Sequence, residues 1–219
     1  MKKIYLSPSE QPENRYSYGD TNEKVQCCKI AEATEAALKR HGFEVITATA
    51  KTLSVRCAEA DNWGADLYVP IHSNAFNKKV TGTRMFCYRT SGEGYKACKA
   101  IFDVLSKLTP GTSESITAQP CLYEVKTPKA PTAYVEVDFH DVPDIAKWII
   151  EHTEEIGEAI CRGICNHYGV TYKEKEKPKA EVKGKLYRVQ VGAYGVKANA
   201  EAMLAKLKKA GFDGYIKEE

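Results

Sequence analysis

The sequence predicts an α/β fold: a mostly parallel, twisted sheet with helices on both faces, followed by a small C-terminal β-α-β module. Strand and helix patterns alternate through the first 170 residues, which is typical of parallel sheets covered on both sides. The segment LYVPIHS at 67–73 is almost continuously apolar, as expected for a strand buried on both faces. After Val170 the chain becomes rich in charge and loses this alternation.

The individual elements follow from local patterns. Strands are predicted at 2–7, 43–49, 67–73, 83–89 and 133–139, and helices at 21–41, 53–63, 92–108 and 142–168. The first helix has Thr21 or Asn22 as its N-cap and Gly42 after its end. The last helix is predicted from isoleucines that recur nearly every four residues on one face, namely Ile145, Ile149, Ile156, Ile160 and Ile164.

The C-terminal part divides into a linker and a module. Residues 171–184 alternate in charge and have no apolar period, so they are predicted to be a solvated linker. Residues 185–194 and 212–217 have strand patterns, and an amphipathic helix between them ends at Gly211. The predicted organisation is therefore a domain at 1–170, a linker at 171–184 and a module at 185–219. So small a module must dock on the domain, pair with another copy or be marginally stable.

Charge and hydropathy exclude several classes of protein. The net charge of +3 is too small to indicate a nucleic-acid partner, although all of the excess lies after residue 170 and favours an anionic polymer or surface. No run approaches the roughly 18 apolar residues of a membrane span, so no stable membrane association is expected. The N-terminus has two lysines but few apolar residues before Ser7, which predicts no signal peptide and synthesis in the cytoplasm.

The eight cysteines fit a reducing compartment. Most of them lie among core residues of predicted helices. Cys161 and Cys165 are one helical turn apart and could be half of a metal site, but no second Cys/His pair follows at zinc-site spacing. We interpret the cysteines as free thiols that pack as small hydrophobic groups.

Two polar residues occupy positions that face inward. Glu23 lies in the first turn of the first helix, four residues before the apolar position Cys27; the simpler interpretation is that it complements the helix dipole. His72 ends the most buried strand and is followed by Ser73 and Asn74; the alternative is a core histidine with satisfied hydrogen bonds.

A third polar residue interrupts an apolar strand. Alternation in AYVEVDF places Tyr134, Glu136 and Asp138 on one face. A buried acid is costly unless a cation or a hydrogen-bond network receives it, so one interpretation is an ion pair of Glu136 with Arg84 or Arg89. The other interpretation is a functional acid whose pKa is adjusted by burial for proton transfer. Together, two glutamates and a histidine suit a zinc site, which needs about three protein ligands and a carboxylate beside the bound water.

The chain from Ile4 to about Val170 resembles the zinc-dependent N-acetylmuramoyl-L-alanine amidases of the amidase-3 type. The matching segments are the opening strand with its loop, TNEK, RHGFEV, VRCAEADNWGADLYVPIHSNA and AYVEVDF. The resemblance implies that Glu23 and His72 are zinc ligands and that Glu136 is the catalytic glutamate. It also implies a substrate, bacterial peptidoglycan, cut between the lactyl group of muramic acid and L-alanine.

The sequence departs from that family in one place. The family's first zinc ligand is a histidine in the loop after the first strand, where this chain reads Ser-Pro-Ser-Glu-Gln at 7–11. Direct alignment puts Glu10 at this position, and one inserted residue puts Gln11 there. Some phage-type relatives look similar in having Ser-Pro-Ser-x-Gln, which favours Gln11, although an amide binds zinc more weakly than imidazole does. A water or His140 stays an alternative third ligand.

The C-terminal segment LYRVQVGAYGVKANAEAMLAKLKKAGFDGYI resembles the first half of a SPOR domain, a module that binds peptidoglycan glycan strands. The similarity is clearest at Val189, Gln190, Val191 and Gly192. Two chains could combine their half-modules in a homodimer. The alternative is a packing appendage without a ligand.

These observations predict a zinc amidase that degrades peptidoglycan. Without a signal peptide, it is expected to be a bacteriophage endolysin that reaches the cell wall when the host is lysed. A hypothesis of a different class is a wall-binding protein that lost catalysis together with the first histidine. An RNA-binding sheet is not favoured, because the tail lacks the Gly-Phe-rich aromatic signature of such modules.

Overall fold

A computed structural model of the chain describes residues 1–50, 52–175 and 189–218. The chain divides into two compact units, Met1–Lys175 and Glu176–Glu219, which are treated separately here. No helix in the described ranges is both long and apolar enough to span a bilayer.

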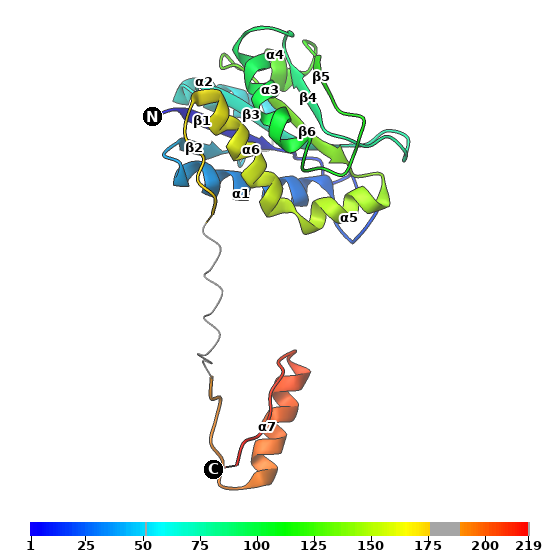
Figure 1. Ribbon diagram of the computed structural model, residues 1–219, viewed down its shortest axis with the longest axis vertical. Coiled ribbons are helices and arrows are strands. Elements are labelled where there is room, and N and C mark those ends of the chain that lie inside the picture. The colour runs from blue at the N-terminus through cyan, green and yellow to red at the C-terminus, as the bar shows by residue number, and fades with distance from the viewer. Residues whose placement is uncertain (51, 176–188, 219) are drawn as a thin grey trace. The chain divides into compact units, whose positions relative to one another are not determined.

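The first unit is built on a six-stranded sheet with the order β2-β1-β3-β6-β4-β5 (Figure 1). All neighbouring strands are parallel except β4 and β6, which are antiparallel. The mostly parallel sheet predicted from the sequence is therefore confirmed. The strands are β1 (Lys3–Pro8), β2 (Glu44–Thr47), β3 (Leu67–Asn74), β4 (Arg84–Cys87), β5 (Ser115–Ala118) and β6 (Tyr134–Phe139).

Helices cover both faces of this sheet, because alternate residues of the strands are apolar on each side. On β1, for example, Ile4 and Leu6 join the main core, whereas Tyr5 joins a smaller core that includes Tyr68 of β3. The main core is formed with α1 (Glu23–Arg40), α3 (Gly92–Leu105), α5 (Pro143–Glu151) and α6 (Thr153–Tyr168). The smaller core is formed with α2 (Leu53–Trp63). The short helix α4 (Tyr123–Lys126) completes the unit.

Three details differ from the sequence predictions. The single helix expected at 142–168 is two helices, because His152 has a non-helical backbone and its ring stacks on Trp148. The elements β5 and α4 were not predicted, since four residues are too few to show a period.

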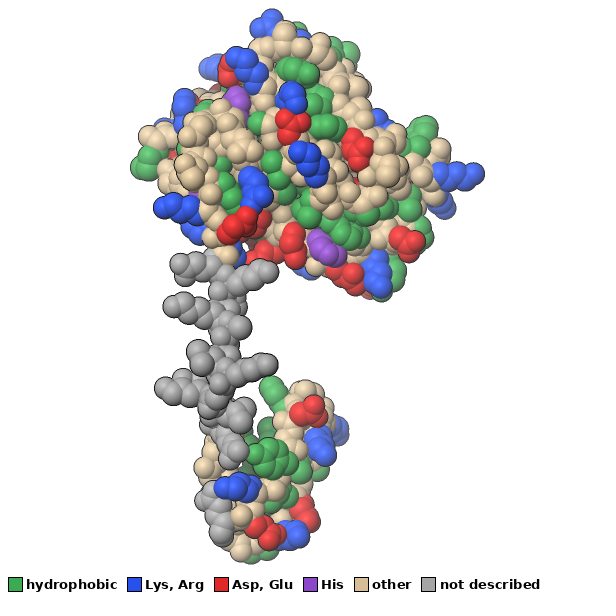
Figure 2. Space-filling view, viewed as in Figure 1, with side chains coloured by type: hydrophobic (Ala, Val, Ile, Leu, Met, Phe, Trp, Pro, Cys, Tyr) green, Lys and Arg blue, Asp and Glu red, His purple; other side chains and the backbone are tan. Residues whose placement is uncertain are grey.

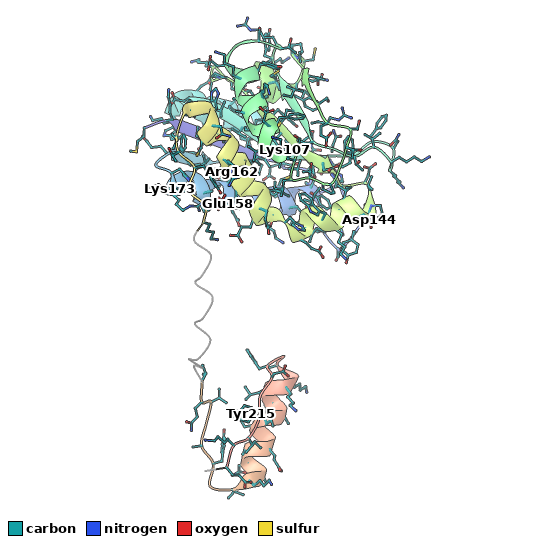
Figure 3. All side chains as sticks on the ribbon, in the orientation of Figure 1. Lys107, Asp144, Glu158, Arg162, Lys173 and Tyr215 are labelled. Atoms are coloured by element: carbon teal, nitrogen blue, oxygen red, sulfur yellow. The ribbon has the colours of Figure 1, made fainter. Side chains whose placement is uncertain are left out.

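The first unit extends into the segment predicted to be linker. The ring of Tyr172 stacks on His41 with 4.8 Å between centroids, and the backbone N–H of Lys173 donates to Nε2 of His41 at 2.8 Å. Tyr172 also donates to Glu158 of α6, and Arg162 lies over its ring. Figure 3 shows Glu158, Arg162 and Lys173 close together at this end of α6. The segment up to Lys175 is therefore part of the first unit, and the rest of the predicted linker lies outside the described residues.

The second unit contains the predicted helix, α7 (Lys197–Lys209). The described residues of the predicted flanking strands, 189–194 and 212–217, are not strands, so this part of the prediction is wrong there; 185–188 lie outside the described residues. A strand needs a partner for its backbone, and no strand pairing occurs in the described part of this unit. Apolar side chains are consequently exposed: Val189 is 89% exposed, and Tyr215, which is labelled in Figure 3, is 71% exposed.

Candidate functional site

The candidate residues converge at the carboxyl ends of the parallel strands, the usual place for ligands in open α/β sheets. His72 on β3 lies opposite Glu136 on β6 in the strand register. Glu23 reaches the same edge from the start of α1, which begins there because the side chain of its N-cap Asn22 accepts a hydrogen bond from the N–H of Val25. The structure thus brings together the three residues that the sequence pointed to.

Glu23 is held in a buried network. Its Oε1 lies 2.8 Å from Nδ1 of His72, and its Oε2 accepts a hydrogen bond from the amide of Asn14 at 2.7 Å. Burial alone would raise the pKa of Glu23, but the hydrogen bonds from His72 and Asn14 outweigh it and lower the pKa. Glu23 therefore does more than complement the helix dipole, because its carboxylate has specific partners inside the protein.

His72 lies between two carboxylates. Nδ1 faces Glu23, and Nε2 lies 3.7 Å from Oε2 of Glu124. The ring stacks on Tyr134, with 4.8 Å between centroids. Burial by itself lowers the pKa of His72, but the interactions with Glu124 and Glu23 and the charge of Glu136 exceed that effect and raise the pKa to about 10.

Glu136 has an oxygen with no partner. Its Oε2 is buried and accepts no hydrogen bond from any residue that the structure describes. Burial raises the pKa of Glu136 to about 8, with Glu23 adding to the shift and His72 opposing it. The structural alternative, an ion pair with Arg84, is not what the structure shows: Arg84 lies opposite Glu136 in the register but donates to Ser115 and Ser113.

In the loop after β1, the two candidates for a third ligand, Glu10 and Gln11, have different partners. Glu10 turns to two cations, with Lys24 at 2.8 Å and Arg56 at 3.4 Å. The amide oxygen of Gln11 instead accepts from the same Asn14 side chain that donates to Glu23. The side chain of Asn14 therefore links Gln11 to Glu23, whereas Glu10 forms ion pairs with Lys24 and Arg56.

His140, the other alternative, has a separate set of partners. Its Nδ1 lies 2.9 Å from the hydroxyl of Ser73, and its ring stacks on Tyr16 with 4.8 Å between centroids. The hydroxyl of Tyr16 is 2.8 Å from the same Ser73 oxygen. These contacts account for His140 as a buried, hydrogen-bonded histidine.

Sequence reasoning missed Glu124 and Asn14. Glu124 belongs to the short helix α4, is 3% exposed and faces His72 from the side opposite Glu23. No periodic pattern marks this segment, although a glutamate between Tyr123 and Val125 is an unusual residue to bury. Asn14 lies in the irregular loop before α1, where an asparagine gives no sequence signal of its own.

The residues fit a divalent metal ion, as the following contacts indicate. An imidazole nitrogen and a carboxylate oxygen face each other at 2.8 Å, both buried, and a carboxylate oxygen without a partner lies nearby. Nitrogen and oxygen donors of this kind are those that zinc takes in catalytic sites. No third His, Cys, Asp or Glu among the described residues completes a compact ligand group with this pair, which leaves an amide or a water as the candidate third donor.

A compact group of possible ligands does occur elsewhere, at His41, Cys161 and Cys165. Sγ of Cys161 lies 3.6 Å from Nδ1 of His41 and 4.0 Å from Sγ of Cys165. However, Nε2 of His41 accepts from the N–H of Lys173, so the ring proton is on Nδ1, which lies 2.8 Å from the carbonyl of Ala37. Because both nitrogens have protein partners, we interpret the group as a buried hydrogen-bond centre, and all eight cysteines are free thiols.

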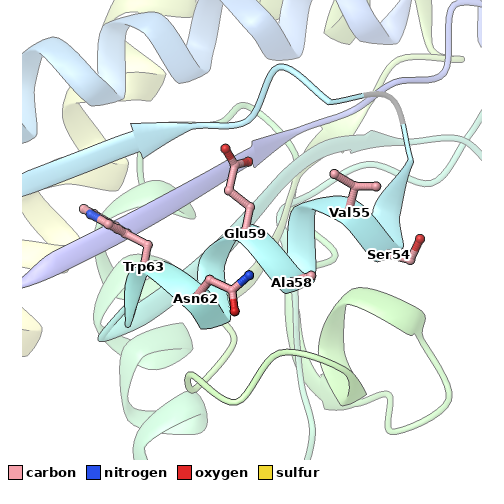
Figure 4. A pocket seen from close by; sticks show the side chains of 6 residues that line it. All are labelled: Ser54, Val55, Ala58, Glu59, Asn62 and Trp63. Carbon is pink, nitrogen blue, oxygen red and sulfur yellow. The ribbon is translucent and has the colours of Figure 1, made fainter.

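One hollow on the surface lies away from this site. A shallow hollow along α2 is lined by side chains of that helix alone, and Glu59 is its one ionisable group (Figure 4). Glu59 already accepts a hydrogen bond from Tyr5. On the face of the molecule seen in Figure 2, basic and acidic side chains of the first unit are interspersed.

Comparison with known proteins agrees with the fold. The catalytic domain of CwlV, an N-acetylmuramoyl-L-alanine amidase from Bacillus (Paenibacillus) polymyxa var. colistinus, superposes with a TM-score of 0.69 and 17% identity, covering 78% of this chain and 100% of that one. The amidase AmiC2 of Nostoc punctiforme gives a TM-score of 0.69 and 20% identity over 77% and 97%. The fold of the first unit is thus that of amidase catalytic domains.

The sequence comparison extends this to the family. Residues 10–166 match the N-acetylmuramoyl-L-alanine amidase family, and this chain belongs to it. Residues 173–219 match the SPOR domain. The sporulation-specific N-acetylmuramoyl-L-alanine amidase of Bacillus subtilis (strain 168) is 25% identical over 225 residues, covering 99% of this chain and 84% of that protein.

Proposed function

We propose that this protein is a zinc-dependent N-acetylmuramoyl-L-alanine amidase that hydrolyses the amide bond between muramic acid and L-alanine in peptidoglycan. Family membership and the similarity to a sporulation-specific amidase support the reaction. The observation that carries the proposal is the buried Glu23–His72 pair beside an oxygen of Glu136 that has no partner.

In this proposal Glu23, His72 and the amide oxygen of Gln11 hold the zinc ion. Zinc would supply Lewis acidity, polarising the scissile carbonyl and making water a better nucleophile at neutral pH. Asn14 fixes the carboxylate of Glu23 and the amide of Gln11 with one NH2 group, so the two oxygens turn toward the same side chain. Gln11 is the weakest donor of the set, because an amide is neutral.

Glu136 moves the proton. Its free Oε2 can accept a proton from the attacking water and then deliver it to the nitrogen of the departing L-alanine. Burial raises the pKa of Glu136 to about 8, so the carboxyl group takes up and returns a proton close to neutral pH. The short contact of His72 with Glu23 leaves Glu136 unpaired for this task.

The second unit directs the enzyme to its polymeric substrate. The SPOR match and the positive charge of the chain after residue 170 support binding of peptidoglycan. Release at host lysis stays a prediction, because the curated relative described above is a sporulation protein and not a phage enzyme. A dimer formed through two half-modules likewise stays a prediction.

The test uses the full chain purified with zinc. We expect close to one bound zinc per chain by elemental analysis, clearing of a cell-wall suspension, and new L-alanine N-termini in the digest. Glu136→Gln should retain zinc and lose at least 100-fold in rate, because the proton acceptor is gone. The matched control is Glu59→Gln, which removes a carboxylate from α2 that also accepts a tyrosine hydroxyl but lies in a different hollow.

A second candidate function is a wall-binding protein without catalysis, favoured by the neutral Gln11 where the family has a histidine. The same experiment separates the two functions. Zinc-free protein that binds walls but neither clears them nor releases L-alanine N-termini would establish the binding protein and refute the enzyme.

A further inference from the structure

A buried carboxylate outside the proposed catalytic set faces the histidine of the site. Glu124 is 3% exposed, and its Oε1 accepts hydrogen bonds from the hydroxyls of Ser7 at 2.5 Å and Tyr68 at 2.8 Å. Its other oxygen, Oε2, lies 3.7 Å from Nε2 of His72. The carboxylate is thus anchored at one oxygen and presents the other to the imidazole.

The hydrogens of this network can be assigned one by one. Arg56 donates from Nη1 to the oxygen of Ser7 at 3.0 Å, so Ser7 accepts there and gives its own hydrogen to Glu124. Tyr68 likewise donates to Glu124. Because both donors reach Oε1, Oε2 is left for a third donor, and the nitrogen that faces it is Nε2 of His72.

This arrangement distinguishes the two ring nitrogens of His72. A neutral imidazole carries one hydrogen, and a carboxylate at Nε2 stabilises the form that carries it there. Nδ1, which donates to Oε1 of Glu23 at 2.8 Å in the structure, is then the nitrogen that offers a lone pair once a metal ion displaces its hydrogen. One nitrogen cannot face both carboxylates, so Glu124 is not placed to share a metal ion with Nδ1 and Glu23.

We propose that Glu124 is a positioning residue: it holds the hydrogen of the neutral imidazole on Nε2 of His72, so that Nδ1 is the nitrogen free to bind a metal ion, and it makes the imidazole a stronger metal ligand. This inference rests on the proposed function. A carboxylate behind a ligating histidine typically contributes 10–100-fold to metal affinity. In this chain that contribution offsets the weakness of a neutral amide at Gln11.

The test measures zinc affinity of the full chain by competition with a chromogenic chelator, independently of activity. Glu124→Gln keeps the shape of the side chain and removes its charge, and we expect about 10–100-fold weaker zinc binding. Glu59→Gln removes the charge of a carboxylate that also accepts a tyrosine hydroxyl but lies away from His72, and it should bind zinc as the unsubstituted chain does. Tyr68→Phe removes one of the two hydrogen bonds to Oε1 of Glu124 and should weaken zinc binding by a few-fold.

A second readout follows the tautomer directly. In the zinc-loaded chain with labelled histidine, long-range 1H–15N correlation should show the His72 proton on Nε2, and Glu124→Gln should weaken or shift that signal. A chain that binds no zinc would refute the proposed function. Tight zinc binding that is equal in the unsubstituted chain and in Glu124→Gln would refute the positioning role alone. If Glu124→Gln does not unfold cooperatively, Tyr68→Phe is judged by the same criterion.

Discussion

Replacing Glu136 with glutamine should make the metal-free protein more stable at alkaline pH. In the folded protein, burial raises the pKa of Glu136 from 4.5 to about 8. Between these two pH values the folded chain keeps a proton that the unfolded chain has released. Because the folded state then binds more protons than the unfolded state, the free energy of unfolding decreases as the pH rises through this interval.

The size of the effect follows from the interval. A difference of about 3.5 pH units, at about 1.36 kcal/mol per unit, corresponds to roughly 5 kcal/mol between pH 4.5 and pH 8. Glutamine does not ionise, so Glu136→Gln lacks this loss. This value of roughly 5 kcal/mol is an upper limit. The charge of Glu136 also helps to raise the pKa of His72, and the variant loses this favourable interaction.

The assay is urea unfolding of chelator-treated protein at several pH values from 5 to 9. The stability difference between Glu136→Gln and the unsubstituted chain should grow in favour of the variant up to pH 8 and then become constant. Glu59→Gln serves as the control, with no such trend. A difference that stays flat with pH would show that Glu136 ionises freely in the folded protein, and the reasoning about its burial would be wrong.

Two further predictions concern parts that support the site. Arg56→Met should destabilise the first unit by about 3–5 kcal/mol in urea unfolding, because Arg56 is buried and donates to Ser7, Pro8 and Ala50. The control Lys39→Met removes an exposed i,i+4 ion pair and should cost under about 0.5 kcal/mol. Equal costs for the two variants would contradict the structural role of Arg56. Tyr172→Ala should lower the free energy of unfolding by about 1–2 kcal/mol and speed hydrogen exchange at 171–175, because the Tyr172 ring packs between His41 and Arg162. The control Tyr88→Ala changes an exposed tyrosine and should have neither effect.

Most of the fold could be predicted because its long elements have clear periods. The run at 67–73 and the alternation at 133–139 appear as β3 and β6, next to each other in the sheet. The antiparallel direction of β4 could not be read from the sequence, because strand direction depends on how the chain returns and not on local pattern. Elements of four residues, such as β5 and α4, have no period at all.

Candidate site residues could be recognised in the sequence where an unusual residue interrupted a regular pattern. Glu136 in an apolar strand and Glu23 on an inward helix face are such interruptions. Glu124 and Asn14 belong to a short helix and a loop, so nothing regular surrounded them to be interrupted. Their importance comes from contacts over distances of 9 to 117 residues along the chain, which only the folded structure shows.

Two carboxylates, those of Glu23 and Glu124, flank His72 and stabilise its protonated form. With a pKa of about 10, the ring is an imidazolium at neutral pH, flanked by the negative charges of Glu23 and Glu124. If zinc binds at Nδ1 as proposed, it would displace this proton, so metal binding and proton release would be linked. Zinc affinity should therefore decrease as the pH falls, because protons compete with the metal for the ring nitrogen.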